Sequence, residues 1–177
     1  MTAPIGSFFK FLEDKKGKKL TGIDNLKYRL TYAPETLTKQ DNEIEGDLYL
    51  NSLTSIPKGF NPTVGGDLFL NGLTSIPEGL NPKVGGSLNL SGLTSIPKEF
   101  NPTVGGDLFL NSLTSIPEGF NPKVDGALVL SSLTSIPKGF NPKVGGYLYL
   151  VNWESNMTQE ELKKRFPNVK GIIYTKK

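Results

Sequence analysis

A block of twenty residues occurs five times in this chain almost without change. It begins at Leu53 and returns at Leu73, Leu93, Leu113 and Leu133. A fixed period near twenty residues is typical of a solenoid, in which one copy cannot bury its own apolar side chains and stacked copies share an elongated core. The sequence therefore predicts a mainly β solenoid that forms one structural domain.

Each unit contains a short segment in which the second and fourth residues are leucine. Side chains alternate along a strand, so these leucines should face the core while the first and third residues face outward. Strands that recur every twenty residues in a regular coil should stack in parallel and in register. The six segments are Asp47–Leu50, Asp67–Leu70, Ser87–Leu90, Asp107–Leu110, Ala127–Leu130 and Tyr147–Leu150.

The rest of each unit should lead the chain back without a helix. Leu53, Ile56, Phe60 and Val64 begin four more inward-facing columns. Two prolines in every unit exclude a helix there, because proline lacks the amide hydrogen that a helix interior needs. We expect an extended or polyproline-like return with tight turns.

Two further columns do not vary. The position before each strand segment is always glycine, whereas the position before that also holds Glu45 and Asp125, which indicates a backbone geometry or close approach reserved for glycine. The asparagine column either bonds to the backbone of an adjacent coil or marks a plain Asn-Pro turn. The two columns are Gly46, Gly66, Gly86, Gly106, Gly126 and Gly146, and Asn61, Asn81, Asn101, Asn121 and Asn141.

The repeated array spans residues 44–150, and the non-repetitive segments 1–43 and 151–177 should cap its two ends. In the N-terminal cap we expect an amphipathic helix over Ser7–Lys16 and an additional strand over Lys27–Tyr32.

The C-terminal cap should also contain a short helix. Thr158 and Glu161 have the spacing of a capping box, and Leu162 and Phe166 would lie on one face of the helix that follows. Pro167 should end this helix, and residues 171–174 can form a last strand.

The composition argues against an enzyme. The chain has no histidine and no cysteine, so it lacks the commonest general base, the commonest metal ligands and a thiolate nucleophile. We expect no catalytic residues, no metal and no cofactor. The array is nearly neutral, which makes nucleic acid an unlikely partner. The apolar stretch at the N-terminus is too short and contains too many charged residues to be a signal peptide or a membrane span. We therefore expect a cytoplasmic protein with no membrane partner.

At Leu68-Phe69-Leu70 and Leu73-Thr74-Ser75-Ile76-Pro77 the chain resembles leucine-rich repeats. More narrowly, it resembles the short-unit leucine-rich-repeat proteins of bacteria and their phages, in which a Val-Gly-Gly-x-Leu-x-Leu strand precedes a Leu-Pro or Ile-Pro return. The resemblance implies protein recognition through the strand-bearing face, and several phage proteins of comparable size inhibit host defence systems. Only two residues separate Leu70 from Leu73, so a flatter β-solenoid is the structural alternative.

The outward strand positions are the candidate binding site. They combine aromatic side chains with carboxylates, and exposed aromatic side chains are enriched in binding hot spots. The alternative is a stacking ladder that supports the sheet. The candidate partner-binding residues are Tyr49, Phe69, Phe109, Tyr147, Tyr149, Asp47, Asp67 and Asp107.

A third outward column alternates in charge sign. It predicts a surface ion-pair ladder that sets the register of the coils, with a charged docking edge as the alternative. Its members are Lys58, Glu78, Lys98, Glu118 and Lys138.

The expected function is therefore non-enzymatic protein binding through the strand-bearing face. This includes inhibition of a bacterial defence complex, such as a CRISPR complex, by a phage protein in the host cytoplasm. The alternative is a structural or assembly protein that self-associates.

Overall fold

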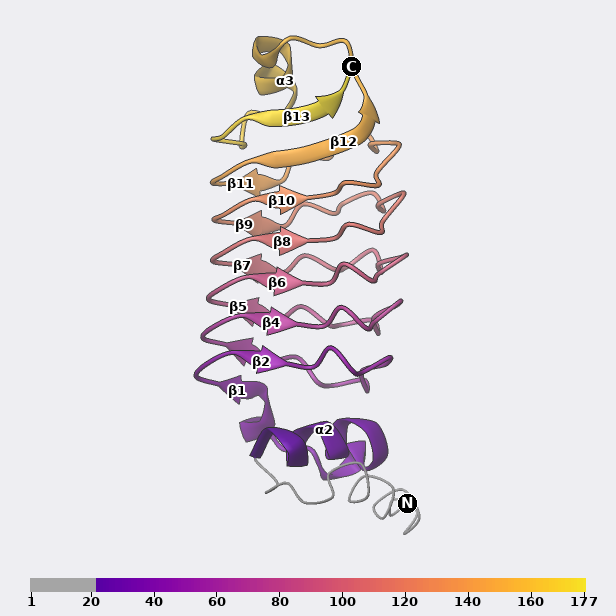
Figure 1. Ribbon diagram of the computed structural model, residues 1–177, viewed down its shortest axis with the longest axis vertical. Helices are drawn as coiled ribbons and strands as arrows, with labels where there is room; N and C mark the ends of the chain where they lie inside the picture. Colours follow the sequence, from indigo (N-terminus) through magenta and orange to yellow (C-terminus); the bar gives the residue numbers. More distant parts are fainter. Residues whose placement is uncertain (1–21) are drawn as a thin grey trace.

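The computed structural model describes residues 22–177, which form a parallel β-solenoid with a helix at each end (Figure 1). The helix expected over Ser7–Lys16 lies outside the described residues. The coils stack directly on one another along the long axis of the molecule (Figure 1). The predicted solenoid with parallel, in-register strands is confirmed.

One side of the coil is a seven-stranded parallel sheet among the described residues. Each strand pairs with the equivalent residues one repeat later, so that Leu68 lies beside Leu88 and Leu88 beside Leu108. The strands are β2 (Leu48–Tyr49), β4 (Leu68–Phe69), β6 (Leu88–Asn89), β8 (Leu108–Phe109), β10 (Leu128–Val129), β12 (Leu148–Glu154) and β13 (Ile173–Lys176).

The return side forms a second parallel sheet of six strands in the same part of the chain. The sequence predicted that the chain is extended on this side of the coil, but it did not predict that these segments pair into a sheet. The valine of each copy points inward, and the next amide bonds to the previous coil, as when Gly65 N–H donates to the Ile44 carbonyl at 2.7 Å. The strands are β1 (Glu43–Ile44), β3 (Thr63–Val64), β5 (Lys83–Val84), β7 (Thr103–Val104), β9 (Lys123–Val124) and β11 (Lys143–Val144).

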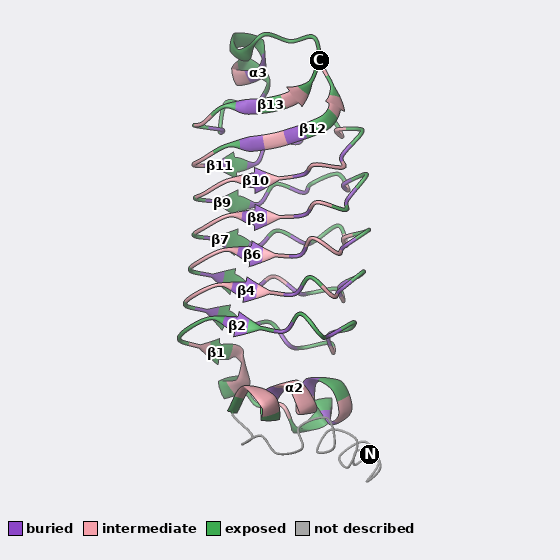
Figure 2. Ribbon diagram, in the orientation of Figure 1, coloured by how far each residue is buried: buried purple, intermediate pink, exposed green. Residues whose placement is uncertain are grey.

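The core lies between the two sheets and runs the length of the stack. Leu68 and Leu70 are both fully buried, which confirms the predicted strand register. Figure 2 shows buried and partly exposed residues alternating along the strands of the seven-stranded sheet. The phenylalanines stack inside the return side, with ring centroids 6.3 Å apart between Phe100 and Phe120 and between Phe120 and Phe140.

The asparagine column is a hydrogen-bonded ladder. The backbone N–H of Asn101 donates to Asn81 Oδ1 at 2.6 Å, and the N–H of Asn121 donates to Asn101 Oδ1 at 2.6 Å. The first rung is Asn42 of the N-terminal cap, whose Oδ1 accepts from the N–H of Asn61. Of the two interpretations of this column, the bonded one is correct, and each asparagine links consecutive coils.

The invariant glycine column reflects a close approach of backbones, as predicted. A Cβ atom added to Gly126 would lie 2.3 Å from Asp107 Oδ1 and 2.6 Å from the Gly106 carbonyl oxygen. These glycines do not adopt the left-handed conformation. That conformation occurs in the turns of the return side, where Gly59 has a φ of 90°.

The N-terminal cap differs from the prediction. The strand expected over Lys27–Tyr32 is wrong, because these residues belong to helix α2 (Gly22–Tyr32). Leu26 and Leu30 are one helical turn apart and both are buried against the first coil. Two 3-10 turns, η1 (Pro34–Thr36) and η2 (Lys39–Asn42), lead from α2 into β1.

An ion pair holds this cap together. Arg29 donates two hydrogen bonds to the Asp41 carboxylate, one of them at 2.8 Å, and a third to the Thr36 carbonyl at 3.2 Å. Burial raises the pKa of Asp41, but the hydrogen bonds from Arg29 and Thr38 outweigh burial and hold that pKa below its usual value. The pair therefore stabilises the ionised carboxylate that joins η2 to α2.

The C-terminal cap is an altered copy of the coil. Helix α3 (Gln159–Arg165) has the predicted capping box, and Leu162 and Phe166 are buried as predicted. Phe166 extends the phenylalanine stack, with its ring centroid 6.0 Å from that of Phe140. Val169 pairs with Val144, and Ile173 of β13 pairs with Leu148, so both lie 25 residues beyond their partners instead of twenty.

Two side chains of α3 occupy the open end of the stack. The Gln159 amide donates to the Ile173 carbonyl at 2.7 Å and accepts from the Ile173 N–H at 3.3 Å, as an additional strand would. The Lys163 ammonium donates to the carbonyls of Val169, Lys170 and Gly171. These contacts satisfy backbone groups that a further coil would otherwise pair with.

The column of alternating charges forms no ion pairs in residues 22–177. The ion pairs found there are Arg29 with Asp41 and Lys176 with Glu154. The predicted ion-pair ladder is therefore wrong. The five side chains are exposed and extend from turns, where hydration competes with pairing.

Candidate protein-binding face

The outward side chains of the seven-stranded sheet form a continuous surface, which we call the aromatic face. It consists of two columns, and both point away from the core as the sequence predicted. The first column is Asp47, Asp67, Ser87, Asp107, Ala127 and Tyr147, and the second is Tyr49, Phe69, Asn89, Phe109, Val129 and Tyr149.

The polar side chains of the first column accept hydrogen bonds from backbone N–H groups of the next coil. Asp67 Oδ1 accepts the N–H of Ser87 at 2.6 Å, and Asp107 Oδ1 accepts the N–H of Ala127 at 2.7 Å. Asp47 and Ser87 accept the N–H of the next coil in the same way. One oxygen of each aspartate is therefore structural, a role that the sequence did not reveal.

The aspartates add to the crowding at the glycines of the following coil. A Cβ atom on Gly86 would lie 2.2 Å from Asp67 Oδ1, and a Cβ atom on Gly66 would lie 2.1 Å from Asp47 Oδ1. Each carboxylate occupies the space that a side chain would need on the following coil. At Gly146, which follows Ala127, the backbone of Gly126 alone lies 2.8 Å from such a Cβ atom, so the aspartates add to a crowding that the backbone already imposes.

The aromatic column begins with a stacked pair. The rings of Tyr49 and Phe69 have centroids 4.8 Å apart and planes inclined by 5°. Tyr49 is half exposed, and its hydroxyl donates to Asp47 Oδ2 at 3.2 Å. This hydrogen bond, helped by the negative charge of Asp47, raises the pKa of Tyr49. Asn89 interrupts the column between Phe69 and Phe109.

Three tyrosines form a cluster at the other end of the aromatic face. Tyr149 stacks on Tyr174 of β13 with a centroid distance of 4.7 Å, and Tyr147 contacts both rings edge-on at 6.2 and 6.0 Å. Tyr174 was missed as a site residue by sequence reasoning. The signal was available, because Gly171-Ile172-Ile173-Tyr174 repeats the spacing of Gly146-Tyr147-Leu148-Tyr149.

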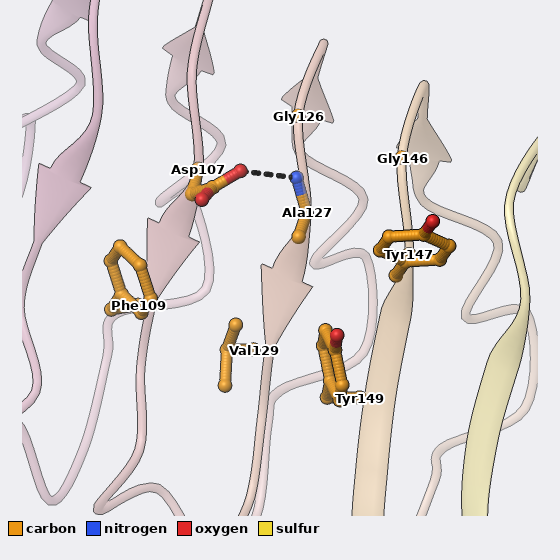
Figure 3. Close-up of a pocket in the computed structure, with 8 residues that line it drawn as sticks. All are labelled: Asp107, Phe109, Gly126, Ala127, Val129, Gly146, Tyr147 and Tyr149. Carbon is orange, nitrogen blue, oxygen red and sulfur yellow. Dashed lines mark hydrogen bonds between the residues drawn. The ribbon is translucent and has the colours of Figure 1, made fainter.

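A hollow lies between Phe109 and this tyrosine cluster (Figure 3). Its volume is about 520 Å³, and its floor is β10, where the small side chains of Ala127 and Val129 point outward. Figure 3 shows Asp107 and Tyr147 on either side of Ala127, and Phe109 and Tyr149 on either side of Val129. The hollow, which we call the Ala127 hollow, exists because these two residues are smaller than their neighbours on β8 and β12.

The structure therefore places all eight predicted site residues on one face, but not in one cluster. Tyr49, Phe69, Asp47 and Asp67 lie at its N-terminal end. Asp107, Phe109, Tyr147 and Tyr149 line the Ala127 hollow. Asn89 and Ser87 on β6 separate the two groups.

Residues 22–177 bring together no three aspartate or glutamate side chains that could hold a metal ion. No helix in the same range has the length and apolar character needed to cross a membrane. Comparison of the chain with known protein families, with curated proteins and with solved structures finds no match. The function has to be argued from the geometry of the aromatic face.

Proposed function

We propose that this protein is a non-enzymatic binding module whose aromatic face docks a partner protein. The observation that supports the proposal is the exposure of large rings on a rigid sheet: Tyr49 is 50% exposed and Tyr147 is 45% exposed. Exposed aromatic patches are uncommon on monomers and frequent at interfaces. Rings already held by stacking lose little conformational freedom when a partner binds.

The mode of action that we propose is steric. A stack of coils with one buried core is a stiff support, and a partner that covers the aromatic face loses access to its own functional surface. From the resemblance to short-unit leucine-rich-repeat proteins of bacteria and phages, we propose that the partner belongs to a bacterial defence complex, such as a CRISPR complex, in the host cytoplasm. No group transfer and no cofactor are part of this mechanism.

A self-assembling structural protein is the second candidate. End-to-end assembly would need free backbone groups at the end of the stack, and Gln159 and Lys163 already bond to several of them. Side-by-side assembly through the aromatic face would use the same residues as partner binding. Sedimentation velocity at increasing protein concentration distinguishes the two functions.

The test compares the two faces of the same coils. The double variant Phe69→Ser/Phe109→Ser alters the aromatic face, and the control Thr63→Ser/Thr103→Ser alters the opposite face of the same coils. We expect affinity capture from host extract to retain one protein with the wild type and the control, and to lose it with the aromatic-face variant, which should still fold cooperatively with a slightly lower unfolding midpoint because the stack of Phe69 on Tyr49 is lost.

Three results would contradict the proposal. Unchanged capture by the Phe69→Ser/Phe109→Ser variant would exclude the aromatic face as the docking surface. Loss of folding in this variant would assign the rings to a structural ladder. Self-association without a foreign partner would favour the assembly protein.

A further inference from the structure

The Ala127 hollow is wide enough to admit a single flat side chain. Neighbouring strands lie about 4.8 Å apart, so Asp107 and Tyr147, two strands apart, stand about 9–10 Å from each other across Ala127. A planar group about 3.5 Å thick fits between two such walls and can make van der Waals contact with one of them. The floor offers only the methyl groups of Ala127 and Val129.

The walls of the hollow change from apolar to acidic along its length. The part above Val129 is bounded by the rings of Phe109 and Tyr149, and the part above Ala127 is bounded by Asp107 and Tyr147 (Figure 3). Asp107 Oδ1 is held by the N–H of Ala127, which fixes the carboxylate in place. Its second oxygen has no hydrogen bond within residues 22–177 and remains available to a ligand.

The charge of the surrounding surface has one sign. The two outward columns of the array contain three aspartates and no lysine or arginine. The nearest basic residue of β13, Lys176, is paired with Glu154 at 2.8 Å. An anionic ligand would meet only carboxylates here, whereas a cation would meet a carboxylate and the electron-rich face of the Tyr149 ring.

We infer that the Ala127 hollow is the binding site for an arginine side chain presented by the partner protein. The three methylene groups of the arginine pack over Val129 between Phe109 and Tyr149. The guanidinium lies over Ala127, where it donates to the free oxygen of Asp107. This inference rests on the proposed function, because it names the chemistry that the aromatic face recognises.

Arginine fits this geometry better than lysine. A guanidinium is planar, weakly hydrated and able to stack on an aromatic ring while it bonds to a carboxylate in its own plane. A lysine ammonium is a compact and strongly hydrated point charge that cannot fill a flat slot. The tyrosine wall is also preorganised, because Tyr147 and Tyr149 contact each other and both contact Tyr174 of the C-terminal cap.

The test uses small probes on the intact protein, with binding followed by backbone amide NMR shifts. We expect Nα-acetyl-arginine amide to shift the amides of Ala127, Val129 and Tyr147 with a dissociation constant on the order of millimolar. Nα-acetyl-citrulline amide, which has the same shape without the charge, should bind about tenfold more weakly, and Nα-acetyl-lysine amide should also bind more weakly.

Three variants locate the site. Asp107→Asn keeps an oxygen that can accept the N–H of Ala127 but removes the charge. We expect this variant to bind the arginine probe about tenfold more weakly than the wild type does. Ala127→Leu fills the slot and should abolish the shifts. Asp67→Asn makes the same chemical change two coils earlier, outside the hollow, and should leave binding unchanged.

Equal binding of the citrulline or lysine probe would overturn the inference, and so would equal losses in Asp107→Asn and Asp67→Asn. The partner experiment separates this inference from the proposed function. A partner that is captured normally by Asp107→Asn and Ala127→Leu refutes the arginine site and leaves the aromatic face as a docking surface. Probe binding without any captured partner refutes the proposed function but leaves the hollow as a guanidinium site.

Discussion

The two outer faces of the solenoid are built on the same coils, but only one carries large side chains in two columns. On the aromatic face both outward columns bear side chains. The opposite face, which we call the threonine-lysine face, has one column of side chains (Glu43, Thr63, Lys83, Thr103, Lys123 and Lys143) beside a column that is mostly glycine. A Cβ atom added to Gly65 or Gly85 would lie 2.2 or 2.3 Å from the carbonyl oxygen of the preceding coil.

The difference teaches that backbone crowding decides which face can carry two columns of outward side chains. The six-stranded sheet brings consecutive coils close together at the glycine column, so side chains there are disfavoured. Glu45 belongs to the first coil, and Asp125 is the exception among the later coils; its N–H still donates to the Val104 carbonyl at 2.9 Å, so a single substitution can be accommodated. The seven-stranded sheet has no such limit at its two outward columns.

The largest expected effect is a direct test of this crowding. Gly85→Ala should lower the free energy of unfolding by about 2–3 kcal/mol, because its Cβ must displace the backbone of the preceding coil. Thr103→Ala, on the same face but in the side-chain column, should stay within about 0.5 kcal/mol of the wild type. Equilibrium denaturation measures both, and equal effects would remove the distinction between the two columns.

The aspartate ladder gives the next largest effect. Asp67→Ala leaves the Ser87 N–H without its acceptor and should cost about 1–2 kcal/mol of unfolding free energy. Asp67→Asn retains an oxygen acceptor, so its stability should be close to that of the wild type. A similar loss in both variants would show that the charge of Asp67, and not its hydrogen bond, stabilises the aromatic face.

A smaller effect is expected from completing the aromatic column. Asn89→Phe places a ring between Phe69 and Phe109 and should raise the free energy of unfolding by about 0.5–1 kcal/mol through stacking. Thr103→Phe, on the threonine-lysine face, has no ring neighbours and should give no gain. Denaturation curves that show destabilisation by Asn89→Phe would mean that the aromatic face is also crowded.

The smallest effect concerns a single proton. The hydrogen bond and the charge of Asp47 hold the pKa of Tyr49 above its usual value, which favours the protonated phenol in the folded protein. The associated stabilisation is therefore present below the unfolded pKa and is lost as the pH rises through the folded one. Asp47→Ala should return the pKa of Tyr49 toward normal in an NMR-monitored alkaline titration, whereas the distant Asp107→Ala should not change it.

Much of the fold could be predicted because the five copies of the repeat can be compared with one another, position by position, within one chain. The inward leucines and the crowding at Gly126 followed from columns that do not vary, and the invariant asparagines left two interpretations of which the bonded one is correct. The C-terminal helix followed from the capping-box spacing of Thr158 and Glu161. Each of these features depends on local periodicity or on contacts between identical neighbours.

The errors have physical causes. Strands such as β3 in the six-stranded sheet are only two residues long and follow a proline. So short a strand has no alternation of apolar and polar residues from which it could be predicted. The prediction of a strand over Lys27–Tyr32 is wrong because the helical spacing of α2 depends on Ile23 and Leu26, which lie outside that segment. The alternating charge column suggested ion pairs, but long side chains on exposed turns remain hydrated.

The amino-acid sequence by itself determined the period, the register and the residues that fill the core, because identical units can bury their leucines only by stacking. The tertiary structure alone decided what the outward side chains meet. Asp107, Ala127 and Tyr147 are twenty residues apart in the chain, and they form one hollow because stacked strands lie side by side. Tyr174 joins them because the 25-residue final coil restores the same strand register. Which outward side chains lie next to each other on adjacent coils is decided by how the strands stack, and not by the residues next to them in the sequence.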